Sequence, residues 1–226
     1  MKHRTIRGKI LYLDNETGET GREWFTITVQ PDGRRTLRAQ CEMDDRRLLR
    51  DVIYSVDADW YPLDCFVRLS IEERLTGTGW FRFTDHLAEC ETFTAAAGRL
   101  SQRVELKEHT PSFGAHPIVC DIWHLARFDR SKGQRIQTSR KVLLSSPEPD
   151  GGSGPMFNAM DLTIEYVGKE KVTVPAGTFE ADHFRFLLDK VGMEPEELWC
   201  VGEDFLPIKI AYPIFNATYE LAELEQ

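Results

Sequence analysis

The sequence predicts a mostly β protein, built as an antiparallel curved sheet or barrel-like sandwich with one short central helix. Segments in which apolar and polar residues alternate recur along most of the chain. Turn-forming residues separate these segments, as in Gln30-Pro31-Asp32-Gly33. One stretch has helical spacing instead, and alternating segments stand on both sides of it. We therefore expect the strands before and after it to belong to one sheet.

The clearest strand lies at 65–72, where Cys65, Val67, Leu69 and Ile71 share one face and Phe66, Arg68, Ser70 and Glu72 share the other. We expect strands over 6–13, 23–29, 34–43, 51–57, 65–72, 80–84, 88–94, 99–107, 161–167, 171–174, 178–188, 198–201, 208–212 and 217–224. We expect turns over 14–18, 30–33, 60–63, 76–79 and 175–177. The glycine and proline residues in these turns supply the backbone torsions that tight turns need.

A helix is predicted over 117–128. Ile118, Ile122 and Leu125 fall on one stripe at helical spacing. Pro117 suits the first turn of a helix, and Arg127 near the end is favourable for the helix dipole. This helix interrupts the run of strands near the middle of the chain.

The whole chain, 1–226, is expected to form a single antiparallel β domain with a mobile Gly/Pro-rich loop at 145–155. That loop reads S-S-P-E-P-D-G-G-S-G-P, a composition that disfavours both helix and strand. Both flanks look like parts of one sheet, which argues against a linker between domains. A loop of this length can also cover a binding site as a lid.

Charge and hydropathy exclude several classes of function. The formal net charge is −9 and no block of Lys or Arg is present, so we expect no nucleic-acid partner. No segment approaches the roughly 18 consecutive apolar residues of a membrane span, so we expect no membrane partner. The first residues lack the apolar run of a signal peptide, which predicts a cytoplasmic protein. The five cysteines are isolated from one another, as expected for reduced thiols in a core.

A resemblance to a known family rests on the last third of the chain. The run V-T-V-P-A-G-T-F-E-A at 172–181 precedes Leu198-Trp199-Cys200-Val201 and Leu206-Pro207-Ile208-Lys209. The chain resembles here a family of bacterial exported proteins, domain of unknown function family 3108, whose members carry a similar V-x-x-P-A-G-T-F-x-A run. The family also places an Asp-started helix upstream, similar to Asp121 onward. The resemblance covers 115–224 and implies a curved antiparallel β architecture with no assigned activity.

The densest cluster of titratable residues is His116, Asp121 and His124. Residues 121 and 124 are three apart and share one face of the expected helix. A histidine beside a carboxylate can carry general acid–base catalysis near neutral pH. The alternative is structural, with Asp121 and His124 hydrogen-bonded to each other to tie the helix to the sheet. The spacing matches no established metal signature, so no metal site is expected.

A second constellation lies on strand faces and combines arginine with aromatic or imidazole neighbours. We expect its members to bind substrate: Arg68, Trp80, Arg82, His183, Arg185 and Trp199. If these faces point into a barrel, they would form a pocket for an apolar or aromatic ligand with an anionic group. If they point outward, they are a solvated surface on which long side chains screen the aromatic rings.

His86 is a further candidate because it follows Asp85 at a strand end, where catalytic residues are often found. A plain surface turn is its alternative interpretation. The sequence contains no Gly-rich phosphate loop, no Gly-x-Ser-x-Gly elbow and no dinucleotide fingerprint. We therefore expect no cofactor.

These observations favour a cofactor-independent enzyme that performs acid–base chemistry, as a lyase, isomerase or hydratase. Its substrate would be a small apolar or aromatic molecule in a β-barrel cavity, with His116, Asp121, His124 and His86 as catalytic candidates. The alternative is a non-catalytic carrier or binding module for a hydrophobic ligand, and a protein-interaction role comes third. A homodimer is compatible with the sequence. Convergent histidine and carboxylate groups in the cavity would favour the enzyme, and an almost wholly apolar cavity the carrier.

Overall fold

Fifteen strands form one sheet in the computed structural model, which describes residues 2–187 and 194–226. The strands are β1 (Arg4–Asp14), β2 (Gly18–Val29), β3 (Arg35–Met43), β4 (Leu48–Val56), β5 (Pro62–Ile71), β6 (Arg74–Phe83), β7 (Leu87–Thr94), β8 (Gly98–Glu105), β9 (Phe113–Gly114), β10 (Ile136–Leu144), β11 (Asn158–Val174), β12 (Gly177–Leu187), β13 (Glu196–Val201), β14 (Leu206–Tyr212) and β15 (Ala217–Glu225). Their order is β8-β7-β6-β5-β4-β3-β2-β1-β15-β14-β13-β12-β11-β10-β9.

The sheet has two wings that meet where β1 pairs with β15. Strands β1–β8 form one antiparallel meander, and β10–β15 form another. The short β9 adds to β10 in parallel orientation. Strands β8 and β9 are the two edges, so the sheet is curved without closing. The mostly β, antiparallel and curved architecture predicted from the sequence is confirmed.

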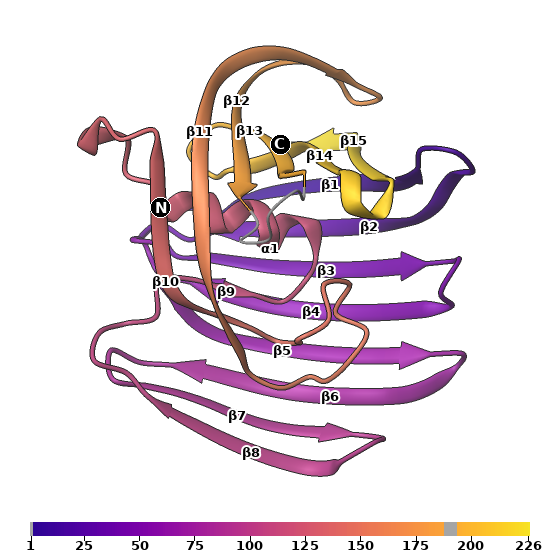
Figure 1. Ribbon diagram of the computed structural model, residues 1–226, viewed down its shortest axis with the longest axis vertical. Helices are drawn as coiled ribbons and strands as arrows, with labels where there is room; N and C mark the ends of the chain where they lie inside the picture. Colours follow the sequence, from indigo (N-terminus) through magenta and orange to yellow (C-terminus); the bar gives the residue numbers. More distant parts are fainter. Residues whose placement is uncertain (1, 188–193) are drawn as a thin grey trace.

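The curl of the sheet brings the two wings face to face around the helix. Figure 1 shows β10–β12 crossing the direction of β3–β8, with α1 (Ile118–Trp123) in the region where they overlap. The Trp123 ring is 5.7 Å from Tyr54 of β4, and His124 is 6.3 Å from Phe186 of β12. The helical segment therefore lies between the wings and packs against both.

Alternation of residue type explains why most strands form where expected. In β4, Leu48, Arg50, Val52, Tyr54 and Val56 are buried, and the residues that alternate with them are more exposed. The segments expected at 161–167 and 171–174 are one strand, β11, which has a bulge beside Gly168 at φ 150°. The strand expected at 178–188 is β12 as far as Leu187, and position 188 lies outside the described residues.

The turn predicted at 76–79 is wrong, because Thr76-Gly77-Thr78-Gly79 lies inside β6. The chain reverses earlier, between β5 and β6. Glu72 and Glu73 both have positive φ there, 51° and 61°, as the central residues of a two-residue hairpin turn. The glycine content predicted a turn at 76–79, whereas the pairing of β5 with β6 places the turn at Glu72 and Glu73.

Gly77 and Gly79 serve close packing within the strand. A Cβ on Gly79 would lie 2.6 Å from Pro155 Cγ, and one on Gly77 would collide with the carbonyl oxygen of Gly154. The loop at 145–155 therefore lies directly on the inner face of β6. A side chain at either glycine would push the loop away.

Aromatic rings fill the space between the loop and the sheet. Phe113 of β9 has its ring 5.8 Å from Tyr54, 5.0 Å from Phe81 and 4.9 Å from Phe83. Phe157, just after the loop, is 5.2 Å from Phe81. These contacts hold β9 and the loop against β4 and β6, and one hydrophobic core continues through both wings.

The helix predicted at 117–128 is present in two parts. It begins as α1 (Ile118–Trp123) and continues as a 3₁₀ turn, η1 (His124–Arg127). Two further 3₁₀ turns are η2 (Arg130–Lys132) and η3 (Pro213–Phe215). No helix in the described part of the chain is long and apolar enough to cross a membrane.

We predict that Gly77→Ala lowers the free energy of unfolding by about 1–3 kcal/mol, because the new methyl group overpacks the contact with the loop. Urea denaturation would measure the loss. Thr78→Ala is the matched control, since it changes the neighbouring residue on the other face of β6 and should cost under about 1 kcal/mol. Equal losses in the two variants would contradict the close approach of the loop.

Candidate functional site

A cavity of about 470 Å³ lies between the curled sheet, α1 and the loop at 145–155. Strands of both wings contribute to its wall, and Pro147, Glu148, Pro149 and Asp150 of the loop cover one side. Much of the wall is apolar and includes Met43, Ile118, Val142, Leu144, Met160, Leu162 and Phe186. Polar groups converge on it from α1, β13, β14 and β15. The cavity therefore combines an apolar body with a localised polar region.

Glu23 of β2 determines where α1 lies. Its buried carboxylate accepts hydrogen bonds from the backbone N–H groups of Ile118, at 2.8 Å, and Val119, at 3.5 Å. The hydroxyl of Tyr12 donates to the same carboxylate at 2.7 Å. Burial raises the pKa of Glu23, and these hydrogen bonds oppose the rise. The carboxylate thus satisfies the free N–H groups at the start of the helix from the floor of the sheet.

Asp121 of α1 and Glu196 of β13 present two carboxyl groups to the cavity. Burial, followed by the charge of Glu23, raises the pKa of Asp121 to about 7. Burial and the charge of Asp121 raise the pKa of Glu196 well above its usual range. The pKa values of Tyr212 and Tyr219 are also raised, mainly by burial and further by the charges of Glu196 and Asp121. At neutral pH the pair therefore retains a proton that two separate carboxylates would have lost.

His116 and His124 also line the cavity, but both are neutral at pH 7. Burial lowers the pKa of His116 to about 3, helped by the nearby Arg50 charge, and lowers that of His124 to about 4. Nδ1 of His124 lies 2.7 Å from Oγ of Ser112. No side-chain hydrogen bond joins His124 to Asp121 in the described structure. Their expected pairing is therefore replaced by a contact between His124 and the segment before the helix.

Arg50 of β4 connects the sheet to the loop that covers the cavity. Its fully buried guanidinium donates to the carbonyl oxygens of His116, at 3.4 Å, and Asp150. His116 itself has φ 70°, a left-handed conformation that costs energy in a residue with a side chain. Nε2 of His116 is buried and has no hydrogen-bond partner among the described residues. Strain and an unsatisfied polar atom thus occur together at the cavity wall.

Three of the four expected catalytic residues, His116, Asp121 and His124, are brought together at the cavity. His86 is not, because it lies exposed in the turn between β6 and β7. The four residues Glu23, Arg50, Glu196 and Tyr219 were missed by sequence reasoning. Glu196 follows Pro195 and precedes Glu197, and nothing in that local pattern shows which of the two glutamates points inward.

The expected substrate-binding residues do not line this cavity. Arg68, Trp80 and Arg82 are exposed on the outer face of β5 and β6. Arg68 lies 3.5 Å from Asp51, and Arg82 lies 3.8 Å from Glu89. For these three residues the structure gives the outward-facing alternative, because the inner positions of the strands are occupied by Cys65, Val67 and Phe81.

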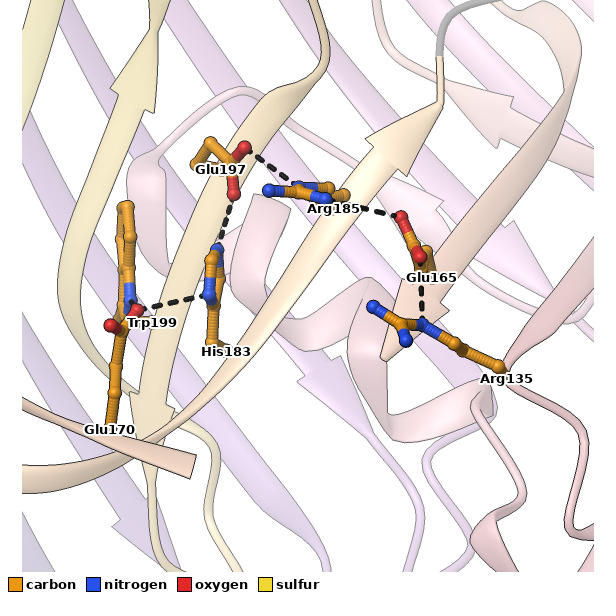
Figure 2. A network of polar contacts seen from close by, with 7 residues as sticks. All are labelled: Arg135, Glu165, Glu170, His183, Arg185, Glu197 and Trp199. Carbon is orange, nitrogen blue, oxygen red and sulfur yellow. Dashed lines mark hydrogen bonds and ion pairs between the residues drawn. The ribbon is translucent and has the colours of Figure 1, made fainter. Parts of the chain in front are cut away.

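His183, Arg185 and Trp199 belong to a polar network on the outer face of β11–β13, shown in Figure 2. Arg185 Nε donates to Glu197 at 2.7 Å, and Glu197 also contacts His183. The imidazole of His183 stacks on Trp199, with 4.5 Å between ring centres. The network continues through Glu165 and Arg135 in one direction and through Glu170 in the other. Each polar group drawn has a partner, so the network ties β11, β12 and β13 together and joins them to Arg135 just before β10.

The five cysteines, Cys41, Cys65, Cys90, Cys120 and Cys200, are free thiols buried in the core, as expected. Burial raises the pKa of each of them. None lines the cavity. No group of three or more His, Cys, Asp or Glu side chains suited to a metal ion occurs within residues 2–187 and 194–226. The titratable side chains that line the cavity include carboxyl, imidazole and phenol groups.

Comparisons with known proteins identify similar folds but do not identify a function. No family model matches the chain, and no curated protein matches it by sequence. A crystal structure of a β-barrel-like protein of domain of unknown function DUF1849 from Brucella abortus is similar over 99% of this chain and 96% of that one, with a TM-score of 0.53 and 13% identity. A DUF1089 family protein from Pseudomonas aeruginosa has a TM-score of 0.47 and 14% identity, with 84% and 89% of the two chains covered.

The first of these likenesses places the chain among β-barrel-like folds. At 13% identity it shows the fold alone. The resemblance to domain of unknown function family 3108 remains a prediction from the sequence.

We predict that Glu23→Ala lowers the free energy of unfolding by about 2–4 kcal/mol, because it leaves the Tyr12 hydroxyl and the Ile118 N–H buried without a partner. Urea denaturation would measure the loss. Glu42→Ala is the control, since Glu42 forms a partly exposed ion pair with Arg22 and should cost under about 1 kcal/mol. A Glu23→Ala loss no larger than the control would show that α1 is held by other contacts.

A second prediction concerns pH. The raised pKa of Asp121, about 7, means that the folded chain keeps a proton that the unfolded chain loses from about pH 4 upward. This group therefore stabilises the fold at low pH, and its contribution is lost as pH rises to about 7. His116 and His124 act in the opposite direction, because their folded pKa values lie below the unfolded ones.

Asp121→Asn removes only the carboxyl contribution. The variant should gain about 1–2 kcal/mol of stability relative to wild type between pH 5 and pH 8, a figure discounted because Asp121 keeps contact with solvent in the cavity. Urea denaturation of both proteins at the two pH values measures the change. Parallel stability curves would show that Asp121 ionises in the folded protein as it does in water.

Proposed function

We propose that this protein binds a small amphipathic organic molecule in the cavity between its curled sheet, α1 and the loop at 145–155. The observation that carries the proposal is a cavity of about 470 Å³, partly open to solvent, with a largely apolar wall and a few convergent polar groups. Ligand sites of small molecules have this size and this composition. Protein interiors are otherwise packed to the density of organic crystals, and an unfilled apolar space costs stability.

The loop is the element that would admit the ligand. It covers the cavity with Pro147, Glu148, Pro149 and Asp150, and its own backbone forms little regular structure. Arg46 binds the carboxylate of Asp150, and Arg50 binds its carbonyl oxygen. In this proposal the loop acts as a cover that opens when those two contacts to Asp150 are released.

Acid–base catalysis at the same cavity is the second candidate. It is favoured by Asp121, whose pKa of about 7 suits a group that both takes and gives a proton near neutral pH. Glu196, whose pKa is raised well above its usual range, would be a second carboxyl group that stays protonated. His116 and His124 would act as neutral hydrogen-bonding groups, because their pKa values are lowered far below 7. The reaction class remains that of a lyase, isomerase or hydratase.

We predict that medium-chain alcohols and aromatic amines or phenols bind and raise the melting temperature. A ligand at 100 times its dissociation constant adds about 2.7 kcal/mol of stability, which corresponds to roughly 5–10 °C for a chain of this size. Ala217→Phe should abolish the shift, because Ala217 lines the cavity and the larger ring fills it. Ala211→Phe is the matched control, since Ala211 pairs with Glu197 on the outer face.

The outcomes separate the two candidates. Shifts in wild type and Ala211→Phe but not in Ala217→Phe would support binding in the cavity. Chemical change of a bound compound by wild type, absent in Asp121→Asn, would support catalysis. An equal shift in Ala217→Phe, or no shift with any compound, would contradict the proposal.

A further inference from the structure

The charges that line the cavity are strongly one-sided. Six carboxyl groups and one guanidinium line it, and the carboxyl groups belong to Asp14, Asp45, Asp121, Glu148, Asp150 and Glu196. The guanidinium, Arg46, is already engaged by Asp150 and lies 3.8 Å from Asp45. The two histidines are neutral at pH 7. The cavity is therefore complementary to a positive charge and unsuited to the anionic ligand that the sequence suggested.

Two of these carboxyl groups lack the partners that buried charges require. Asp14 accepts hydrogen bonds from the N–H groups of Glu16 and Thr17 in its own turn. In contrast, the side-chain carboxyl groups of Asp121 and Glu196 have no hydrogen bond and no ion pair to any other group within the described part of the chain. Glu196 is only 9% exposed, and it faces the cavity from β13. A carboxyl group this buried normally has a donor, and this one faces the cavity, where a ligand can supply the donor.

Aromatic rings surround the same region. Tyr12 and Tyr219 meet edge to face with ring centres 4.9 Å apart, and Tyr212 meets Phe215 at 4.7 Å. All four rings line the cavity. Carboxylates combined with aromatic rings are the side chains that recognise ammonium groups, through ion pairing and through cation–π attraction. A hydroxyl group would satisfy the hydrogen bonds but would leave the excess negative charge uncompensated.

We propose that the ligand carries a protonated amine, held between Asp121 and Glu196, on an apolar body that lies against the aliphatic and aromatic wall of the cavity. This inference rests on the proposed binding function and specifies the chemical class of the ligand. The ammonium group takes the place of protons that these carboxyl groups retain near neutral pH because their pKa values are raised. Binding near neutral pH therefore releases up to one proton from the protein.

The pH dependence follows from the same exchange. The groups coupled to the pair by charge are Glu23 of β2, Arg50 of β4 and the phenols of Tyr212 and Tyr219. The two neutral histidines line the same cavity. An alkylamine, with a pKa of about 10, stays charged from pH 6 to pH 8. As the pH falls through about 7, protons compete with it for the carboxylates. Affinity for an amine should thus fall about fivefold or more from pH 8 to pH 6.

Isothermal titration calorimetry with n-octylamine, 1-octanol and octanoate tests the inference, because the three probes share one apolar chain and differ in charge. We expect octylamine to bind wild type at least about tenfold more tightly than octanol at pH 7.5, and octanoate most weakly. Titration in two buffers of different ionisation enthalpy should reveal the released proton. Glu196→Gln should reduce the preference for octylamine over octanol to under about threefold. Glu180→Gln, the same change at an exposed position on β12, should leave the preference intact.

The results distinguish this inference from the proposal beneath it. Equal binding of octylamine and octanol, or tighter binding of octanoate, would overturn the amine while leaving the cavity as a binding site. Failure of all three probes to bind would overturn the binding function and the amine with it. The preference and the proton release in wild type are decisive even if Glu196→Gln proves unstable.

Discussion

The buried carboxylate of Glu23 is the interaction on which the candidate site depends. It projects from β2 and accepts the first N–H groups of α1, while Tyr12 donates to it from β1. A helix of six residues has little stability of its own, so its position must come from tertiary contacts. With the start of α1 held against the sheet, Asp121 and His124 necessarily face the space between the wings. The cost of burying Glu23 is offset by hydrogen bonds that also fix the site.

The shape of the cavity depends on a second constraint, the close approach of the loop to β6. Gly77 and Gly79 leave room for the backbone at Gly154 and for the ring of Pro155. Phe157 then packs on Phe81, and the N–H of Phe157 donates to Gln102 on β8. The loop thereby bridges the gap between the two edges of an open sheet. An open sheet with a bridged gap leaves a space beside it that a closed small barrel would fill with side chains.

The sequence contained enough information for the fold class and for part of the site. Alternation in segments such as β4 and β5 reports one buried face, and the 3.6-residue spacing at 118–125 reports the helix. The proximity of His116, Asp121 and His124 follows from that helix. Alternation cannot say which face of a strand is the concave one, so Arg68, Trp80 and Arg82 were assigned to a pocket as readily as to a surface. Glu196 and Arg50 reach the site through pairings distant in sequence, which no local pattern encodes.

The pairing of β1 with β15 has a consequence for how the chain is made. One neighbour of β1 is the adjacent hairpin strand, and the other lies some two hundred positions further along the sequence. During synthesis the first wing can assemble while one side of β1 still exposes its unpaired backbone groups. Those groups are a template for any other extended segment until the last strand of the sheet emerges. The correctly paired sheet therefore depends on β15 reaching this edge before another extended segment does.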